Sequence, residues 1–249
     1  MAAAGAVPPL VTMLTSPNVQ MQSNSALALA GLSSGHAENQ AIIARAGAIA
    51  PLCLMLRDGV AEVLEATAAA MWALSDGNQV NKMTIGKLAG IEPLVALTVN
   101  ASNDRAHERA VGALISLSFK MNDNRDLIAK LLVMRLGHRP GTPILVSAAA
   151  INVLSACCQL AQDTNANQSS LAKAGAVPQI IAWLAGGLNG RDANADVQCE
   201  AARALLKLVE NNASLQQAVA RAGGVPSLIG LAGNGRLDAR KYAAATLWQ

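Results

Sequence analysis

The side chains that could carry out catalysis are few and far apart in the sequence. None of the three histidines, His36, His107 and His138, has a partner at the spacing of a metal site or a catalytic triad. Gly86-Lys87 is followed by Leu88, and no glycine lies five residues before Gly86, so it does not form a phosphate-binding loop. We therefore expect surface histidines, no catalytic site, no metal and no cofactor.

The cysteines give no sign of metal or redox chemistry either. Cys53, Cys157, Cys158 and Cys199 show no CxxC spacing and lie in apolar, helical contexts. We interpret them as reduced thiols of a core. The N-terminus lacks the basic region of a signal peptide, and no uninterrupted apolar stretch approaches ~18 residues. The sequence thus predicts no membrane span and a cytoplasmic protein, with nuclear shuttling left open.

Composition indicates a helical protein whose surface carries little charge. Hydrophobic residues make up 52% of the 249 residues but aromatic residues only 2%, so the core must be built from Ala, Leu, Ile, Val and Met. The net charge is +3, divided as −2 over residues 1–100 and +5 over 101–249. With one Tyr, one Phe and three Trp there is no aromatic ladder for single-stranded nucleic acid, and we expect no nucleic-acid partner.

The sequence repeats itself. The stretch "NQAIIARAGAIAPL" at 39–52 returns as "NQSSLAKAGAVPQI" at 167–180, and Pro9, Pro51 and Pro93 are spaced 42 residues apart. Each repeat predicts a short helix, a second helix that begins at the proline, and a long Ala-rich third helix. An Asn is the expected N-cap of the short helix, at Asn39, Asn124 and Asn167. An Ala-Gly corner is expected to end it, with left-handed glycines at Gly47, Gly90, Gly175 and Gly223.

The alternation of "AGAIAPLxxxL" with "AAxALxxL" resembles the armadillo repeat. It is closer to the generic, scaffold-type armadillo proteins than to importin-α. The resemblance implies an all-α fold, a right-handed α-solenoid of about six armadillo repeats with three helices each. We expect one array over 1–249, with units 1–35, 36–77, 78–120, 121–163, 164–211 and 212–249. The first and last units are incomplete, so the array is expected to belong to a longer chain. The fourth is irregular: it lacks the Ala-Gly corner and carries "GHRPGT", where we expect a kink.

The resemblance also implies a concave groove lined by the third helices. Aligned on their Ala-x-Leu core, the positions of the importin-α Asn ladder read Gly31, Asp76, Ser116, Ala156, Lys207 and Gln249, with no Asn. The accompanying Trp positions read Leu27, Trp72, Gly112, Asn152, Arg203 and Ala245, with one Trp. A nuclear-import adaptor is therefore the less favoured interpretation.

The groove candidates are thus polar, charged and aromatic residues of the third helices, namely Asn24, Leu27, Gly31, Glu65, Ala69, Trp72, Asp76, Arg105, Arg109, Ser116, Asn152, Glu200, Arg203, Lys207 and Tyr242. Trp72 is assigned to the groove in preference to the core, and Trp183 to the core. A partner with acidic residues opposite Arg109 and Lys207 is the sharper hypothesis. The alternative is that these cations are solvated, or pair with nearby acids where a pair contributes ~0–1 kcal/mol.

The function that follows is a non-catalytic scaffold that binds partner proteins or extended peptides. Two alternatives stay open: the substrate-recruiting arm of a larger enzyme such as a ubiquitin ligase, and an architectural subunit of a large cytoskeletal or ciliary assembly. Because an uncapped repeat exposes its apolar face, we also expect the ends, at 1–15 and 236–249, to fray or to associate end to end.

Overall fold

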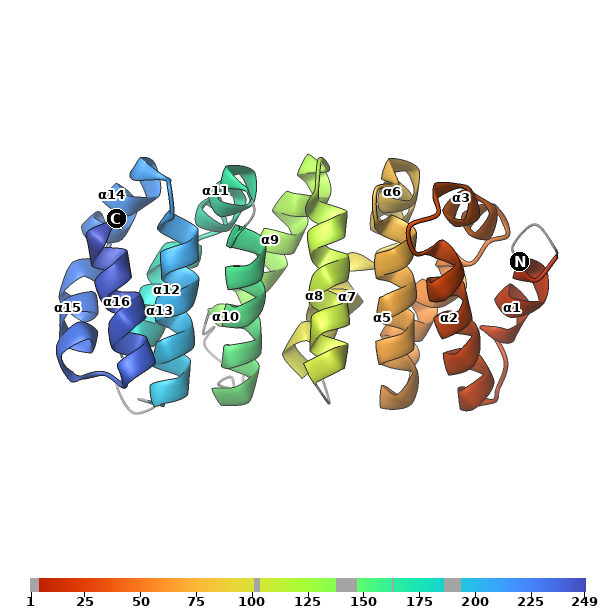
Figure 1. The fold of residues 1–249 in the computed structure, drawn as a ribbon, viewed down its shortest axis with the longest axis horizontal. Helices are drawn as coiled ribbons and strands as arrows, with labels where there is room; N and C mark the ends of the chain where they lie inside the picture. The colour runs from red at the N-terminus through yellow and green to blue at the C-terminus, as the bar shows by residue number, and fades with distance from the viewer. Residues whose placement is uncertain (1–4, 101–103, 138–146, 163, 186–193) are drawn as a thin grey trace. The chain divides into compact units, whose positions relative to one another are not determined.

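The computed structural model describes residues 5–100, 104–137, 147–162, 164–185 and 194–249, and these form sixteen helices and no strand. The helices follow the predicted repeat (Figure 1). The short first helices are α3 (Ala37–Arg45), α6 (Gln79–Lys87), α11 (Asn165–Lys173) and α14 (Ala213–Arg221). The second helices are α1 (Val7–Met13), α4 (Ile49–Asp58), α7 (Ile91–Asn100), α12 (Ala176–Leu184) and α15 (Gly224–Asn234). The third helices are α2 (Val19–Ser33), α5 (Ala61–Ser75), α8 (Asp104–Ser118), α10 (Ser147–Gln162), α13 (Ala195–Val209) and α16 (Leu237–Trp248).

Two compact units make up the chain, residues 1–128 and residues 129–249. Within the first unit α2 packs against α5, and α5 packs against α8. Within the second, α13 packs between α10 and α16. In each unit, therefore, the third helices stack side by side, as the all-α solenoid of three-helix repeats requires (Figure 1).

The predicted Asn caps of the first helices are wrong. Free N–H groups at the starts of α6, α11 and α14 are instead accepted by the side chains of Asn78, Thr164 and Asn212. Asn39, Asn124 and Asn167 lie inside their helices. Their side-chain amides donate to the carbonyl oxygens of Leu32 at 2.7 Å, Leu117 at 3.2 Å and Leu160 at 2.8 Å. Asn81 likewise donates to Leu74 at 2.8 Å. Each Asn thus satisfies a carbonyl that the last turn of the preceding third helix leaves unpaired.

The residue after this Asn joins one repeat to the next. The side-chain amide of Gln40 donates to the carbonyls of Ala73 at 2.8 Å and Asp76 at 2.9 Å, at the end of the following third helix. Gln168 does the same for Lys207 and Glu210. Lys82 takes this place on α6, where its buried ammonium donates to the carbonyl of Phe119 at 3.2 Å. Burial lowers the pKa of Lys82, Asp76 opposes that shift and Lys120 adds to it.

The Ala-Gly corners hold at three of the four predicted places. Gly47, Gly175 and Gly223 have φ of 84°, 94° and 76°, a region that side chains disfavour. At the fourth corner the left-handed residue is Ala89, with φ of 55°. Gly90 serves close packing instead, because a Cβ there would lie 2.9 Å from the sulfur of Cys53.

The fourth repeat departs from the others as its missing corner predicts. In place of a short helix and a turn it has one continuous helix, α9 (Asn122–Leu136). Residues 138–142 of the "GHRPGT" segment lie outside the described residues, so the kink expected there stays a prediction.

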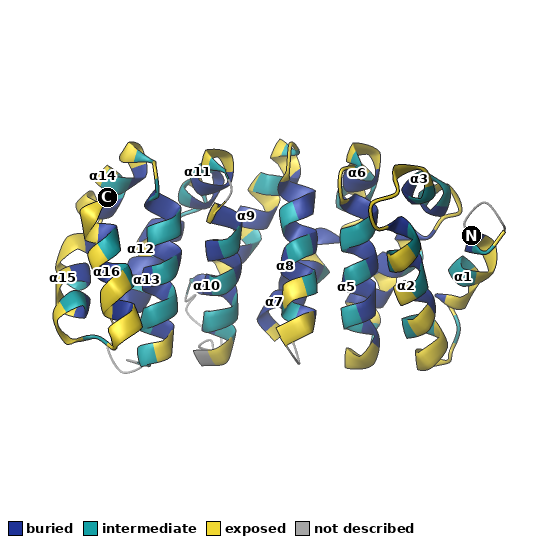
Figure 2. Cartoon of the chain, in the orientation of Figure 1, coloured by how far each residue is buried: buried dark blue, intermediate teal, exposed yellow. Residues whose placement is uncertain are grey.

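The core is aliphatic, as the composition predicts (Figure 2). Trp183 is confirmed as a core residue: it is buried, and its indole N–H donates to the carbonyl of Leu136 at 3.3 Å. All four cysteines are free; Cys53, Cys157 and Cys158 are buried, whereas Cys199 is only half-buried. Among the described helices none is both long and apolar enough to cross a membrane. Helices α3 and α4 reach the required length and hydropathy only as a pair, and the chain bends by 79° between them.

Candidate binding face of the third helices

The third helices bury one side against the second helices and leave the other side half-exposed or exposed (Figure 2). We call this side the third-helix face; it is presented by α2, α5 and α8 in the first unit, and by α10, α13 and α16 in the second. All the predicted groove residues lie on these six helices or, for Asp76, directly after α5. All but Ser116 are at least partly exposed.

The helix ends fix the true register of this face. A residue with positive φ follows α2, α5, α8 and α13, at Gly35, Gly77, Lys120 and Asn211. The Asn-ladder position lies four residues before each of these positive-φ residues. In α10 it lies one residue before Leu160, whose carbonyl Asn167 binds. This column therefore reads Gly31, Ala73, Ser116, Gln159 and Lys207. The Trp column reads Leu27, Ala69, Gly112, Ser155 and Arg203.

The alignment on Ala-x-Leu is therefore displaced by three residues in α5 and α10. Trp72, Asp76, Asn152 and Ala156 do not occupy the columns assigned to them. The cause is the Ala-rich composition of these helices, since alanines recur in successive turns of α5 and α10. In the corrected columns there is still no Asn, and there is no Trp.

Trp72 is half-buried at the contact between α5 and α8. Three atoms of its indole ring lie 2.8–2.9 Å from the position that a Cβ on Gly112 would occupy, so only glycine leaves room for the ring. The guanidinium carbon of Arg109 is 5.6 Å from the ring centroid, within the range of a cation–π contact. Trp72 thus forms a wall of the third-helix face and positions a cation above it.

The other predicted groove residues of the first unit differ in exposure. Asn24, Leu27, Gly31, Asp76 and Arg105 are exposed, and Glu65 and Ala69 are half-exposed. Ser116 is buried, and its hydroxyl accepts a hydrogen bond from Ser75 at 2.9 Å. Ser116 therefore joins α5 to α8 and offers little to a partner.

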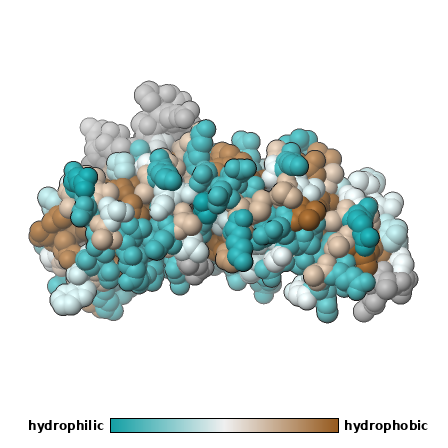
Figure 3. Space-filling model, turned by 90° about the horizontal axis from the view of Figure 1, so that it is seen from above, coloured by the Kyte–Doolittle hydropathy of each residue, from teal (hydrophilic) through white to brown (hydrophobic). Residues whose placement is uncertain are grey.

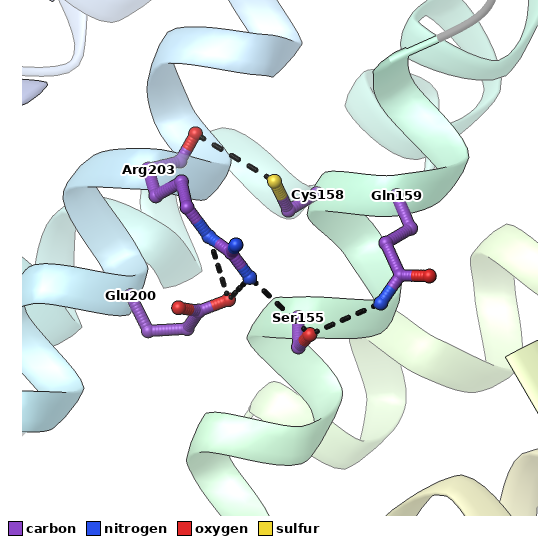
Figure 4. Close-up of polar contacts among 5 residues, drawn as sticks. All are labelled: Ser155, Cys158, Gln159, Glu200 and Arg203. Atoms are coloured by element: carbon purple, nitrogen blue, oxygen red, sulfur yellow. Dashed lines mark hydrogen bonds and ion pairs between the residues drawn. The ribbon is translucent and has the colours of Figure 1, made fainter. Parts of the chain in front are cut away.

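In the second unit the cations of the face are paired with acids of their own helix. The guanidinium of Arg203 forms an ion pair with Glu200 and donates to Ser155 Oγ at 3.4 Å (Figure 4). The backbone carbonyl of Arg203 accepts a hydrogen bond from the thiol of Cys158. Lys207 lies 2.9 Å from Glu210. Asn152 and Tyr242 are half-exposed nearby. The positive charge of Arg203 and Lys207 is thus largely balanced before any partner arrives.

The residues capable of chemistry do not converge. His36 is exposed, and His138 lies outside the described residues. His107 is half-buried on α8: its Nδ1 donates to the carbonyl of Thr98 at 3.1 Å, and its Nε2 is buried. Burial raises the pKa of Cys53 and Cys158 to about 11 and that of Cys157 to about 12, so these thiols are poor nucleophiles. Over the described part of the chain, no three His, Cys, Asp or Glu side chains gather as metal ligands would.

Residues 1–34 match the family model of the armadillo/β-catenin-like repeat. No curated protein sequence matches the chain. Among solved structures, an engineered protein is 25% identical, with a TM-score of 0.61, and the match covers 97% of this chain and 95% of the other. A designed armadillo repeat protein in complex with the peptide (KR)4 is 23% identical, with a TM-score of 0.62 and 98% of both chains covered.

A computationally designed armadillo repeat protein for modular peptide recognition gives a TM-score of 0.59 at 23% identity, with coverage of 97% and 98%. These similarities agree with the six third helices, the corner glycines and the repeat-to-repeat hydrogen bonds of the structure. The chain therefore has the fold of the armadillo-repeat proteins, and its first 34 residues match the model of the repeat itself.

Proposed function

We propose that the chain is a non-catalytic scaffold that binds partner proteins or extended peptides along the third-helix face. The observation that carries this proposal is the stacking of third helices that leave one polar, half-exposed side unpacked in each unit. The designed armadillo protein that binds (KR)4 supports it, because that protein shares the fold over almost the whole chain. We place the protein in the cytoplasm, which imaging of a fluorescent fusion would test.

The first unit offers the most specific contact for such a partner. Arg109 is half-exposed above Trp72 and forms no ion pair with the residues that the structure describes around it. Arg105 is exposed one turn earlier on α8. Arg203 and Lys207 are already paired, so we assign the acidic residue of a partner to Arg109 first and to Lys207 second. The indole of Trp72 would pack against the aliphatic stem of a neighbouring partner residue.

A peptide-library selection on the purified chain tests this assignment. We expect the selected peptides to share an acidic residue and to lose at least about tenfold in affinity for Arg109→Glu, since a favourable charge pair becomes a repulsive one. Arg57→Glu is the matched control, because Arg57 is an exposed cation of α4, away from the third-helix face. Equal losses for both variants, or peptides with no acid, would refute the assignment to Arg109.

A further inference from the structure

The first helix of every complete repeat carries a basic residue at the same place. The nine-residue helices α3, α6, α11 and α14 end on Arg45, Lys87, Lys173 and Arg221. In the longer helix α9, Lys130 is the ninth residue. We call these five residues the first-helix cations.

The first-helix cations are all exposed, and none of them forms an ion pair with the residues described by the structure. The side chain of Arg45 donates to the carbonyl of Ala41, and that of Arg221 to the side chain of Gln217, both within the same helix. Of the twelve other Lys and Arg residues that the structure describes, half lie at ion-pair distance from a carboxylate: Arg57, Arg125, Arg203, Lys207, Arg236 and Lys241.

Charge is concentrated on these helices. With α9 taken whole, the five first helices hold eight basic and three acidic residues, a net charge of +5, whereas the whole chain has +3. Helices α11 and α14 have no acidic residue at all. In the space-filling view of Figure 3, hydrophilic residues cover much of the face shown.

The helix dipole gives one reason for this placement, because a cation near a C-terminus stabilises a helix by about 0.3–1 kcal/mol at the surface. It does not explain why acids near these cations are so few, since an exposed pair would leave the dipole interaction intact. A surface that keeps its cations unpaired in every repeat is suited to a partner of opposite charge.

We propose that, within each unit, the first-helix cations bind an acidic, extended polypeptide segment, on a surface separate from the third-helix face. In the first unit α3 contacts α6, and packed helices lie about 8–10 Å apart. A chain in the polyproline II conformation makes one turn every three residues and rises about 3.1 Å per residue, so carboxylates at every third residue lie on one face, about 9 Å apart, and match one cation per repeat.

A lipid surface fits less well. Helices α6 and α9 expose large hydrophobic side chains, namely Val80, Met83, Leu127 and Met134, but α3, α11 and α14 expose none. Charge is therefore the property that the first helices share, and membrane insertion would need apolar side chains along the whole set. The first helices also contain no aromatic residue on which the bases of single-stranded RNA could stack.

The test measures binding of a fluorescent peptide with Glu at every third residue and Ser or Gly between. One variant changes Arg45, Lys87, Lys173 and Arg221 to Gln. A matched variant changes Arg57, Arg236, Arg240 and Lys241 to Gln; these are also exposed, so both variants lose four positive charges. We expect the first variant to lose at least about tenfold in affinity and the second less than about threefold, with wild-type binding weakened by salt. Arg109→Glu should leave this binding unchanged, which separates the result from the proposed function.

Three outcomes would overturn the proposal. Equal losses in the two variants would show that only net charge matters. If the first variant had a lower melting temperature but unchanged binding, the cations would serve only to stabilise the C-termini of their helices. Tighter binding of single-stranded RNA or phosphatidylserine vesicles than of the peptide, lost in the first variant, would assign the surface to another class of anion.

Discussion

Two glycines of the third helices should respond oppositely to the same substitution. Both Gly31 in α2 and Gly112 in α8 lie inside helices, where alanine is more favourable than glycine by about 1 kcal/mol. A Cβ on Gly31 would meet no atom within 4 Å, whereas one on Gly112 would lie 2.8 Å from the indole of Trp72. Overpacking of this kind costs about 1–3 kcal/mol.

We therefore expect Gly31→Ala to raise the free energy of unfolding by about 0.5–1 kcal/mol. Gly112→Ala should lower it by up to about 2 kcal/mol, the overpacking cost less the gain in helix propensity. Urea unfolding followed by far-UV circular dichroism measures both. With Trp183 and Trp248 replaced by Phe, the emission of Trp72 should shift to longer wavelength in Gly112→Ala, as the ring is pushed towards solvent.

A double-mutant cycle isolates the contact itself. In a Trp72→Leu background the clash is gone, so Gly112→Ala should become stabilising, as Gly31→Ala is. If Gly112→Ala were stabilising with Trp72 in place, or if the two substitutions were additive, the packing of Trp72 on Gly112 would be refuted.

Three further predictions concern the repeat-to-repeat contacts and the thiols. Asn81→Ala should lower the free energy of unfolding by about 1–3 kcal/mol, because it leaves the buried carbonyl of Leu74 without its donor; urea unfolding checks this against Asn122→Ala, an exposed site on α9. Lys82→Gln should not destabilise at neutral pH, since Gln40 and Gln168 make the same carbonyl contacts without a buried charge. The pKa of Lys82 is lowered on folding, so wild-type stability should rise relative to Lys82→Gln as pH increases from the folded pKa towards about 10.4, and a flat difference over that window would contradict the burial of a charged Lys82. Of the four thiols, only Cys199 should react with a disulfide reagent in the native state, and mass spectrometry of labelled peptides would expose any early reaction of Cys157.

The repeat pattern was enough to predict the helices and their order, because proline at the start of a second helix and Ala-Gly at the corner act locally. The caps were mispredicted because Asn can accept from a helix start or donate to a helix end, and only the fold decides between them. The same limit applies at Gly90, where the left-handed residue is the preceding Ala89.

The candidate residues lie on the third helices as predicted, but the register was wrong in two of those helices, α5 and α10. The Ala-rich sequences of α5 and α10 do not distinguish neighbouring turns, whereas the Asn side chains that cap the third helices do. The pairing of Lys207 with Glu210, three residues apart, agrees with the alternative in which the cations of this face pair with nearby acids. The contact of Trp72 with Gly112 depends on the packing of two repeats, which no local pattern records.

The central claim is that partners bind the third-helix face, and site-specific photo-crosslinking in cells tests it most directly. A benzophenone amino acid at Ala69, half-exposed on α5, reports on that face; the same group at Leu54, exposed on α4, is the control. We predict crosslinks to a discrete partner from Ala69 that disappear with Arg109→Glu, and none from Leu54. Crosslinks from Leu54 while Ala69 stays silent would contradict the account.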